Sequence, residues 1–348
     1  MLLIKRFLLV IVTCAICFVA NAQRETSKYE ATYKDIVGML EGQQSLDFKK
    51  AVFLVEDAYL GGVLDYKAYD YTLQYYKSLC EKLIQTRDLE YDGIDINRVS
   101  KFAAVYTVMK DTIPVIQSDG EMFYHMPFEY DFEDISGESD WRKMFVTKLL
   151  STHKGNCHSL PYLYKIITEE LGEEAHLAFA PNHIYIKQRC KSMGWYNTEL
   201  TSGMFPVDSW LMASGYIHLK SIQNGVYMDA LNDKQSIAVC LVDLAQGYQK
   251  KFGKDDGAFV LKACEKALEY YPNYINAMLL QVETKFHMWE MNVEDNNENK
   301  AKGLAEIQAI YNRIHELGYR KMPEEMYLDW LVSLKNEGEK YNNKKIRF

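Results

Sequence analysis

Most of this chain has the hydrophobic spacing of α-helices, but residues 154–201 combine one helical run with segments of strand type. Cys157 opens a helical run in this stretch, and Gly172 is the expected end of that run. Three short segments of strand type follow, at residues 175–180, 183–187 and 195–201. A helix beside a small sheet needs a mixed core, because each element must bury one face against another. The sequence therefore predicts an α+β fold with its sheet in the middle of the chain.

The region before this stretch has a helical pattern. Phe48, Val52, Val55 and Tyr59 recur at helical spacing, and Gly61-Gly62 ends that segment. Two further helices are predicted near residues 69–85 and 99–109. The inner face of the first of these is predicted to hold Tyr71, Leu73, Tyr76 and Leu79. We expect residues 23–120 to form a helical N-terminal region. Residues 141–150 are also predicted to form one helix, with Phe145, Leu149 and Leu150 facing inward.

The period becomes helical again from Ile237 onward. One helix face holds Leu241, Leu244, Ala245 and Tyr248. Pro272 follows the next helix along the chain. These offsets resemble a tetratricopeptide repeat, although the turn at residues 254–257 is about three residues longer than the consensus. Residues 276–288 and 303–317 could form a second, degenerate pair. We predict tetratricopeptide-like repeats over residues 236–335 and a polar tail over 336–348.

Residues 1–22 have the features of a secretory signal peptide. Lys5 and Arg6 precede an apolar run at residues 7–20, and Ala20-Asn21-Ala22 is a small-x-small cleavage site. An uncleaved membrane anchor is the alternative, but the apolar run is short for a membrane span. We predict cleavage near Ala22 and an exported protein, periplasmic or secreted, without stable membrane insertion.

The acidic charge argues against a nucleic-acid partner, and the spacing of the residues that could bind a metal argues against a metal site. The chain has 40 Lys and Arg against 48 Asp and Glu, with no basic stripe. The acidic residues 128–140 do not have the spacing of an EF-hand loop, so a solvated loop is expected there. A zinc site would need ligands without the usual short paired spacing, namely Cys157, His158, His176, His183 and Cys190. We predict no metal, no cofactor and a protein or peptide partner.

Five cysteines follow the predicted signal peptide: Cys80, Cys157, Cys190, Cys240 and Cys264. In an oxidising compartment an odd number leaves at least one thiol unpaired. If Cys157 is that thiol, the other four are either paired or simply buried. The sequence leaves both possibilities open.

Cys157 is placed for nucleophilic chemistry because it stands at the start of a helix. Unsatisfied N–H groups and the helix dipole favour the thiolate there, and the same N–H groups could stabilise an oxyanion. Lys154 adds positive field, and Gly155 allows a sharp turn into the helix. His183, at the head of a strand, is the candidate base that relays the proton. His176, on the preceding strand, is its main competitor.

A catalytic imidazole needs an orienting partner on its other ring nitrogen. Strand alternation places Asn197 and Glu199 on the same face of the run at residues 195–201. Periodicity alone does not separate these two candidates.

The motifs together resemble the transglutaminase-like superfamily, which belongs to the papain-like class of cysteine enzymes. They are Gly155-Asn156-Cys157-His158-Ser159, Leu163-Tyr164, Leu171-Gly172 with Ala175, Asn182-His183-Ile184-Tyr185 and Asn197-Thr198-Glu199-Leu200-Thr201. More narrowly, the chain is similar to bacterial members that also carry tetratricopeptide repeats. The resemblance places the nucleophile on Cys157, the base on His183 and the acidic partner on Glu199, with Thr201 in register. Glutamate stands where the family usually has aspartate, and Trp141 is a possible additional oxyanion donor.

The resemblance implies a papain-like core over residues 121–235, with the Cys-bearing helix packed on a small antiparallel sheet. It further implies an exported cysteine peptidase, amidase or protein-glutamine acyltransferase that acts on protein or peptide amides through a thioester. The alternative is a non-catalytic interaction module, in which the fold is a scaffold and the repeats bind a partner.

Overall fold

The computed structural model describes residues 25–116, 119–291, 297–336 and 348. The predicted signal peptide and all of the predicted polar tail except residues 336 and 348 lie outside this range. The described residues form a mixed structure of helices and small sheets, as the sequence predicted, so the fold class is α+β. Among them, no helix combines the length and the apolar character that a membrane span requires.

The N-terminal part is mainly helical. Residues 25–40 are helical, and three helices follow: α2 (Phe48–Tyr59), α3 (Tyr66–Thr86) and α4 (Ile96–Lys110). Asp47 and Asp65 cap α2 and α3 through side chains that accept hydrogen bonds from Lys50 N and Lys67 N. These caps satisfy N–H groups that a helix start leaves without a partner.

The predicted inner face of the second helix is wrong at Tyr71, whose side chain is 79% exposed. The buried face of α3 consists of Tyr69, Leu73, Tyr76, Leu79, Cys80 and Leu83. Tyr71 lies two residues from Leu73, which is about 200° around a helix of 3.6 residues per turn. It therefore points to solvent when Leu73 points to the core.

The single helix predicted for residues 141–150 is two elements. A 3₁₀ helix η1 (Trp141–Met144) ends at Phe145, whose backbone is extended (ψ 136°), and α5 (Val146–Thr152) begins after it. The first N–H groups of α5 donate to the buried carboxylate of Glu56 from α2, at 2.6 and 2.9 Å. This long-range cap explains why the break is stable, and no local sequence signal announces it.

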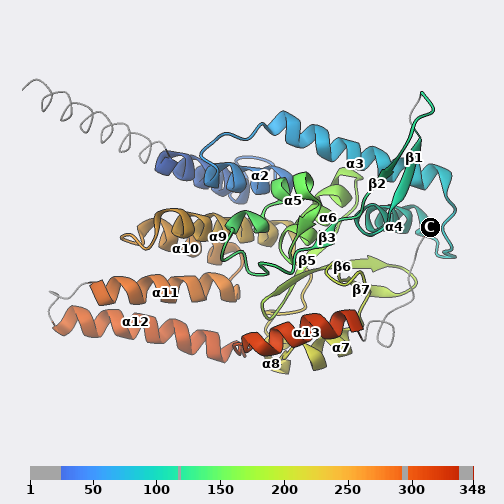
Figure 1. The fold of residues 1–348 in the computed structure, drawn as a ribbon. Coiled ribbons are helices and arrows are strands. Elements are labelled where there is room, and N and C mark those ends of the chain that lie inside the picture. Colours follow the sequence, from blue (N-terminus) through green and yellow to red (C-terminus); the bar gives the residue numbers. More distant parts are fainter. Residues whose placement is uncertain (1–24, 117–118, 292–296, 337–347) are drawn as a thin grey trace, which may run out of the picture.

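The central sheet has three antiparallel strands in the order β5 (His176–Ala180), β6 (His183–Cys190) and β7 (Gly194–Thr198). Helix α6 (Ser159–Glu170) packs against it (Figure 1). Two smaller pairs accompany it, antiparallel β1 (Ile113–Ile116) with β2 (Met122–His125) and parallel β3 (Glu129–Tyr130) with β4 (Lys154–Gly155). The third predicted strand is shorter than expected, because after Thr198 only a bridge between Glu199 and Met204 continues it.

The C-terminal part returns to helices: α7 (Asp208–Ser214), α8 (Leu219–Gln223), α9 (Asp233–Phe252), α10 (Ala258–Tyr270), α11 (Ile275–Met291), α12 (Asn297–Glu316) and α13 (Glu324–Asn336). Helices α9 to α12 contact each other in sequence, which produces the stacked layer in Figure 1. Asn232 and Gln235 form a capping box at the start of α9. Helix α13 returns across the molecule to lie near α7 and α8.

The sequence left open whether the cysteines other than Cys157 are paired or simply buried, and the described residues decide between these possibilities. All five cysteines there are buried and none forms a disulfide.

Candidate active site

Cys157 lies in the turn just before α6, where close packing fixes its backbone. The Asn156 side chain accepts hydrogen bonds from the N–H groups of His158 and Ser159, at 3.0 and 3.2 Å. Gly155 was expected to allow a sharp turn into the helix, but its φ is not positive, so the turn does not need glycine for that reason. A Cβ on Gly155 would instead lie 2.4 Å from Oγ of Ser159, so glycine is needed for close approach.

The Asn156 cap also narrows the expected set of oxyanion donors. Two N–H groups at the start of α6 already donate to its side chain, whereas no hydrogen bond among the described residues occupies the Cys157 N–H. Trp141 lines the pocket beside Cys157, and Lys154 is exposed on β4. Of the N–H groups at this turn, the Cys157 N–H therefore remains available to a developing oxyanion.

His183 and Glu199 form a buried pair. Nε2 of His183 donates to Oε2 of Glu199 at 2.5 Å, and the two residues are 2% and 1% exposed. The other carboxylate oxygen accepts the Thr201 N–H at 2.7 Å. This bond holds the carboxylate in one orientation, and so fixes which imidazole nitrogen it engages.

The second imidazole nitrogen, Nδ1, is left to face the thiol. Nδ1 is buried and has no hydrogen-bond partner among the described residues, while His183 and Cys157 lie close enough to shift each other's pKa. Burial alone would raise the pKa of the Cys157 thiol, but the neighbouring His183 outweighs burial and lowers it. Burial would lower the pKa of His183, but Glu199 and Cys157 raise it. These opposite shifts favour a thiolate–imidazolium pair.

Sheet register decides between the two candidate orienting residues. Asn197 pairs with Lys187, four residues along β6 from His183, or about 13 Å at 3.3 Å per residue. Extending the register by two residues places Glu199 next to Tyr185, diagonal to His183. The Asn197 amide instead donates to Pro206 O and to Asp208, at 2.9 and 2.7 Å. Glu199, and not Asn197, therefore orients His183.

A second histidine–carboxylate pair stands next to the thiol. His158 Nδ1 lies 2.9 Å from Met144 O, and its Nε2 lies 3.2 Å from Asp243 on α9. Both neighbours are acceptors, so both ring nitrogens must donate, which describes an imidazolium. Although burial lowers the pKa of His158, Asp243 raises it above its ordinary value. A fixed positive charge thus lies beside Cys157.

His176, the competing base, does not reach the thiol. Its Nδ1 lies 2.9 Å from Leu231 O, and its ring makes an edge contact with Trp195. The structure thus brings Cys157, His183 and Glu199 together and leaves His176 outside the group.

Several residues of the site escaped the sequence analysis. Tyr327 and Trp330 of α13 contact Cys157 and His183, and Asp243 of α9 contacts His158. Tyr130 of β3 also lies close enough to interact with Cys157 and Tyr327. These side chains come from elements up to 170 residues distant in the chain. No motif marks them, so only a three-dimensional contact could identify them.

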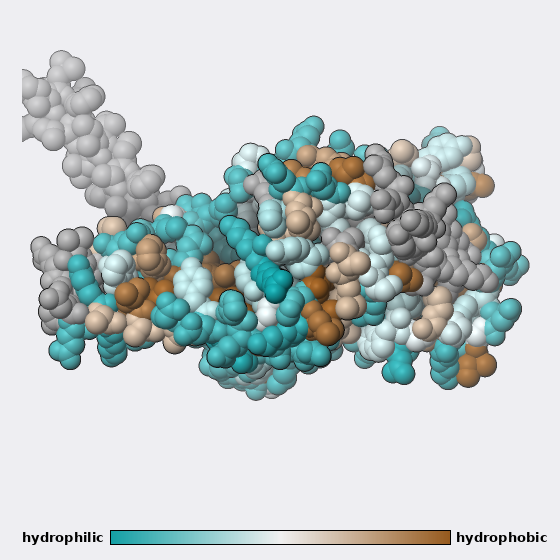
Figure 2. Space-filling view, turned by 90° about the horizontal axis from the view of Figure 1, so that it is seen from below, coloured by the Kyte–Doolittle hydropathy of each residue, from teal (hydrophilic) through white to brown (hydrophobic). Residues whose placement is uncertain are grey.

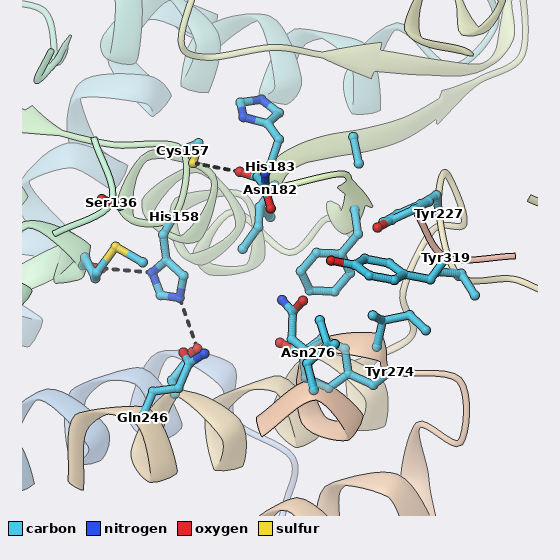
Figure 3. A pocket seen from close by; sticks show the side chains of 18 of the residues that line it. Ser136, Cys157, His158, Asn182, His183, Tyr227, Gln246, Tyr274, Asn276 and Tyr319 are labelled. Atoms are coloured by element: carbon cyan, nitrogen blue, oxygen red, sulfur yellow. Dashed lines mark hydrogen bonds and ion pairs between the residues drawn. The ribbon is translucent and has the colours of Figure 1, made fainter. Parts of the chain in front are cut away.

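A pocket of about 300 Å³ opens beside the thiol. Figure 3 shows Cys157, Asn182 and His183 at one side of it and Tyr227, Tyr274 and Tyr319 at the other. His158 reaches from the Cys157 side toward α9, the helix that also carries Gln246. The reacting residues therefore open onto a confined, largely uncharged space.

The described residues contain no group of three or more His, Cys, Asp or Glu side chains that could share a metal ion. Comparisons with models of protein families, with curated proteins and with solved structures found no match to this chain.

Proposed function

We propose that this protein is an exported, transglutaminase-like cysteine hydrolase or acyltransferase with a papain-like core, acting on amide bonds of proteins or peptides. The observation that carries the proposal is the buried series Cys157, His183 and Glu199. A thiolate–imidazolium pair stands at a helix start, and a carboxylate fixes the imidazole at 2.5 Å. This arrangement supplies a nucleophile, a proton donor and an orienting group.

The first half of the reaction forms a thioester. The Cys157 thiolate attacks the amide carbonyl carbon, a C–S bond forms, and the carbonyl electrons move to oxygen, which the Cys157 N–H stabilises. When the tetrahedral intermediate collapses, the C–N bond breaks and His183 gives its Nδ1 proton to the departing amine. Glu199 keeps its negative charge and accepts the hydrogen bond from Nε2–H of His183 throughout.

The second half releases the acyl group. Neutral His183 removes a proton from water, the resulting hydroxide attacks the thioester, and the C–S bond breaks to restore the thiolate. An acceptor amine in place of water gives acyl transfer instead. We favour hydrolysis, since water is always present, while an amine requires its own binding site.

The experiment uses the purified chain with casein as the protein substrate and dansylcadaverine as the amine. Released ammonia, new N-termini and incorporated dansyl report amidase, peptidase and transferase chemistry respectively. We expect at least one of these products from the wild type. Cys157→Ala and His183→Ala should each abolish it, whereas His176→Ala should preserve it. Absence of every product, together with an iodoacetamide reaction rate at Cys157 that His183→Ala leaves unchanged, contradicts the proposal.

The second candidate is a non-catalytic interaction module. The observation that favours it is that Cys157 is only 9% exposed, with Tyr327 3.6 Å from its sulfur. A scaffold of this kind would present the helices α9 to α12 to a protein partner. A thiol that reacts no faster than free cysteine at neutral pH favours this candidate over the enzyme.

A further inference from the structure

Helix α13 covers one side of the reacting pair. The Tyr327 hydroxyl lies 3.6 Å from the Cys157 sulfur, and the Trp330 ring meets the His183 ring edge-on at 4.8 Å. Both aromatic residues are buried, at 7% and 4% exposure. No heavy atom of a substrate fits between the Tyr327 hydroxyl and the sulfur at this distance.

The contacts of α13 make it a wall of the site. Its Trp330 stacks on Trp210 of α7, with ring centroids 6.4 Å apart, and the same Trp330 ring contacts His183. Leu328 and Val332 of the same helix are exposed on its outer side. Figure 2 views the molecule from below, the side on which α12 and α13 lie in Figure 1, and its surface mixes hydrophilic residues with smaller hydrophobic patches. The side of α13 that faces the site therefore carries two aromatic rings, Tyr327 and Trp330.

Another side of Cys157, next to Asn182, borders a pocket. The pocket of about 300 Å³ begins beside Cys157 and extends past Asn182 to Tyr227, Tyr274 and Tyr319, and no α13 residue whose side chain the structure describes lines it. Apart from the reacting pair Cys157 and His183, its charged lining groups are His158 and Asp243, which form a pair with each other. The pocket thus offers aromatic rings and neutral polar groups to whatever enters, which suits an uncharged segment.

We propose that Tyr327 and Trp330 determine specificity by closing one side of the site. Cys157 then accepts an amide carbonyl that lies near the end of an uncharged segment, which enters through the open pocket. A carbonyl in the middle of an extended chain is excluded. This inference rests on the proposed cysteine chemistry and adds to it the kind of substrate that can reach the sulfur.

The length of an extended chain supports this restriction. Each residue of an extended peptide spans about 3.3–3.6 Å. A chain that crosses the sulfur needs at least one residue of room on both sides of the reacting carbonyl. The open pocket provides that room on one side, and Tyr327 and Trp330 fill it on the other.

The test compares two uncharged peptidyl vinyl sulfones, which thiolates alkylate by addition to the double bond. One ends at a methyl sulfone, and the other continues for three further residues beyond the sulfone. We expect the wild-type chain to react with the blunt probe at least about tenfold faster than with the extended one, a difference of about 1.4 kcal/mol. In the Tyr327→Ala/Trp330→Ala double variant we expect this ratio to fall below about threefold.

Leu328→Ala is the matched control, since Leu328 is on the same helix and 41% exposed; its ratio should stay that of the wild type. Tyr327→Ala alone serves as a second variant if the double variant does not fold, as judged by circular dichroism, and should also lower the ratio. Equal rates with the two wild-type probes, or a ratio that neither aromatic variant changes, overturns the inference. Reaction with iodoacetamide separates this inference from the proposed function. A rate that does not depend on His183 contradicts the proposed cysteine chemistry. A rate that depends on His183, together with equal rates for the two probes, contradicts only the role of Tyr327 and Trp330.

Discussion

Glu199 accepts a hydrogen bond from His183 at 2.5 Å in an environment that excludes almost all solvent from both side chains. A charge in such surroundings is stable only with a partner, so each group changes the protonation of the other. Burial raises the pKa of Glu199, but His183 outweighs burial and lowers it. The effect extends through His183 to the Cys157 thiol.

Glu199→Gln should weaken the thiolate. Loss of the carboxylate charge lowers the pKa of His183, and a less protonated imidazole no longer stabilises the anion of Cys157. We expect the thiol pKa to rise by a unit or more, so that the alkylation rate at pH 6 falls about tenfold or more. The rate of iodoacetamide reaction between pH 4 and 10 measures this. Glu173→Gln, which alters the ion pairs with Arg98 and Lys101 at the surface, is the control and should leave the profile in place.

Asp243→Asn should affect the same profile less strongly. The substitution removes the charge that keeps His158 protonated, and His158 then adds less positive field at Cys157. We expect the thiol pKa to rise by about half a unit, with about a threefold lower alkylation rate on the acidic limb. A profile that coincides with the wild type would mean that His158 is neutral or electrostatically silent.

Stability should depend on pH through His183. Its folded-state pKa is raised from an ordinary value of 6.5 to about 10. Its contribution to the free energy of unfolding is therefore complete below about pH 6.5 and is lost as the pH rises toward 10. Because the Cys157 thiol titrates in the opposite sense, urea unfolding is compared for Cys157→Ala and Cys157→Ala/His183→Gln, in which Glu199 is still present to raise the pKa of His183. Their stability difference should narrow over this interval. A difference that widens with pH would show that the buried imidazole is neutral.

Gly155→Ala should destabilise the fold through a clash. The added Cβ would lie 2.4 Å from Oγ of Ser159 and 2.9 Å from Cδ1 of Leu149. We expect a loss of about 1–3 kcal/mol in the free energy of unfolding. Gly247→Ala is the control, because a Cβ there meets no atom closer than 3.5 Å inside helix α9. It should be neutral or stabilise by up to about 1 kcal/mol, and equal losses in the two variants would contradict the explanation.

The sequence by itself predicted what local periodicity and local chemistry decide. The helical segments, the three short strands and the placement of Cys157 before a helix follow from spacing over fewer than twenty residues. The turn at Gly61-Gly62 and the helix end at Gly172 follow from the positive φ that glycine tolerates. The assignment of Tyr71 to the inner face was wrong, although helical spacing already places Tyr71 opposite Leu73.

Tertiary structure decided everything that depends on contacts between distant segments. Alternation places Asn197 and Glu199 on the same face, but only the register between β6 and β7 brings Glu199 to His183. Glu56 breaks the helix predicted for residues 141–150 from ninety residues away, and Tyr327 reaches Cys157 across 170 residues. Such contacts depend on how whole elements pack, and packing leaves no periodic trace in the sequence of either partner.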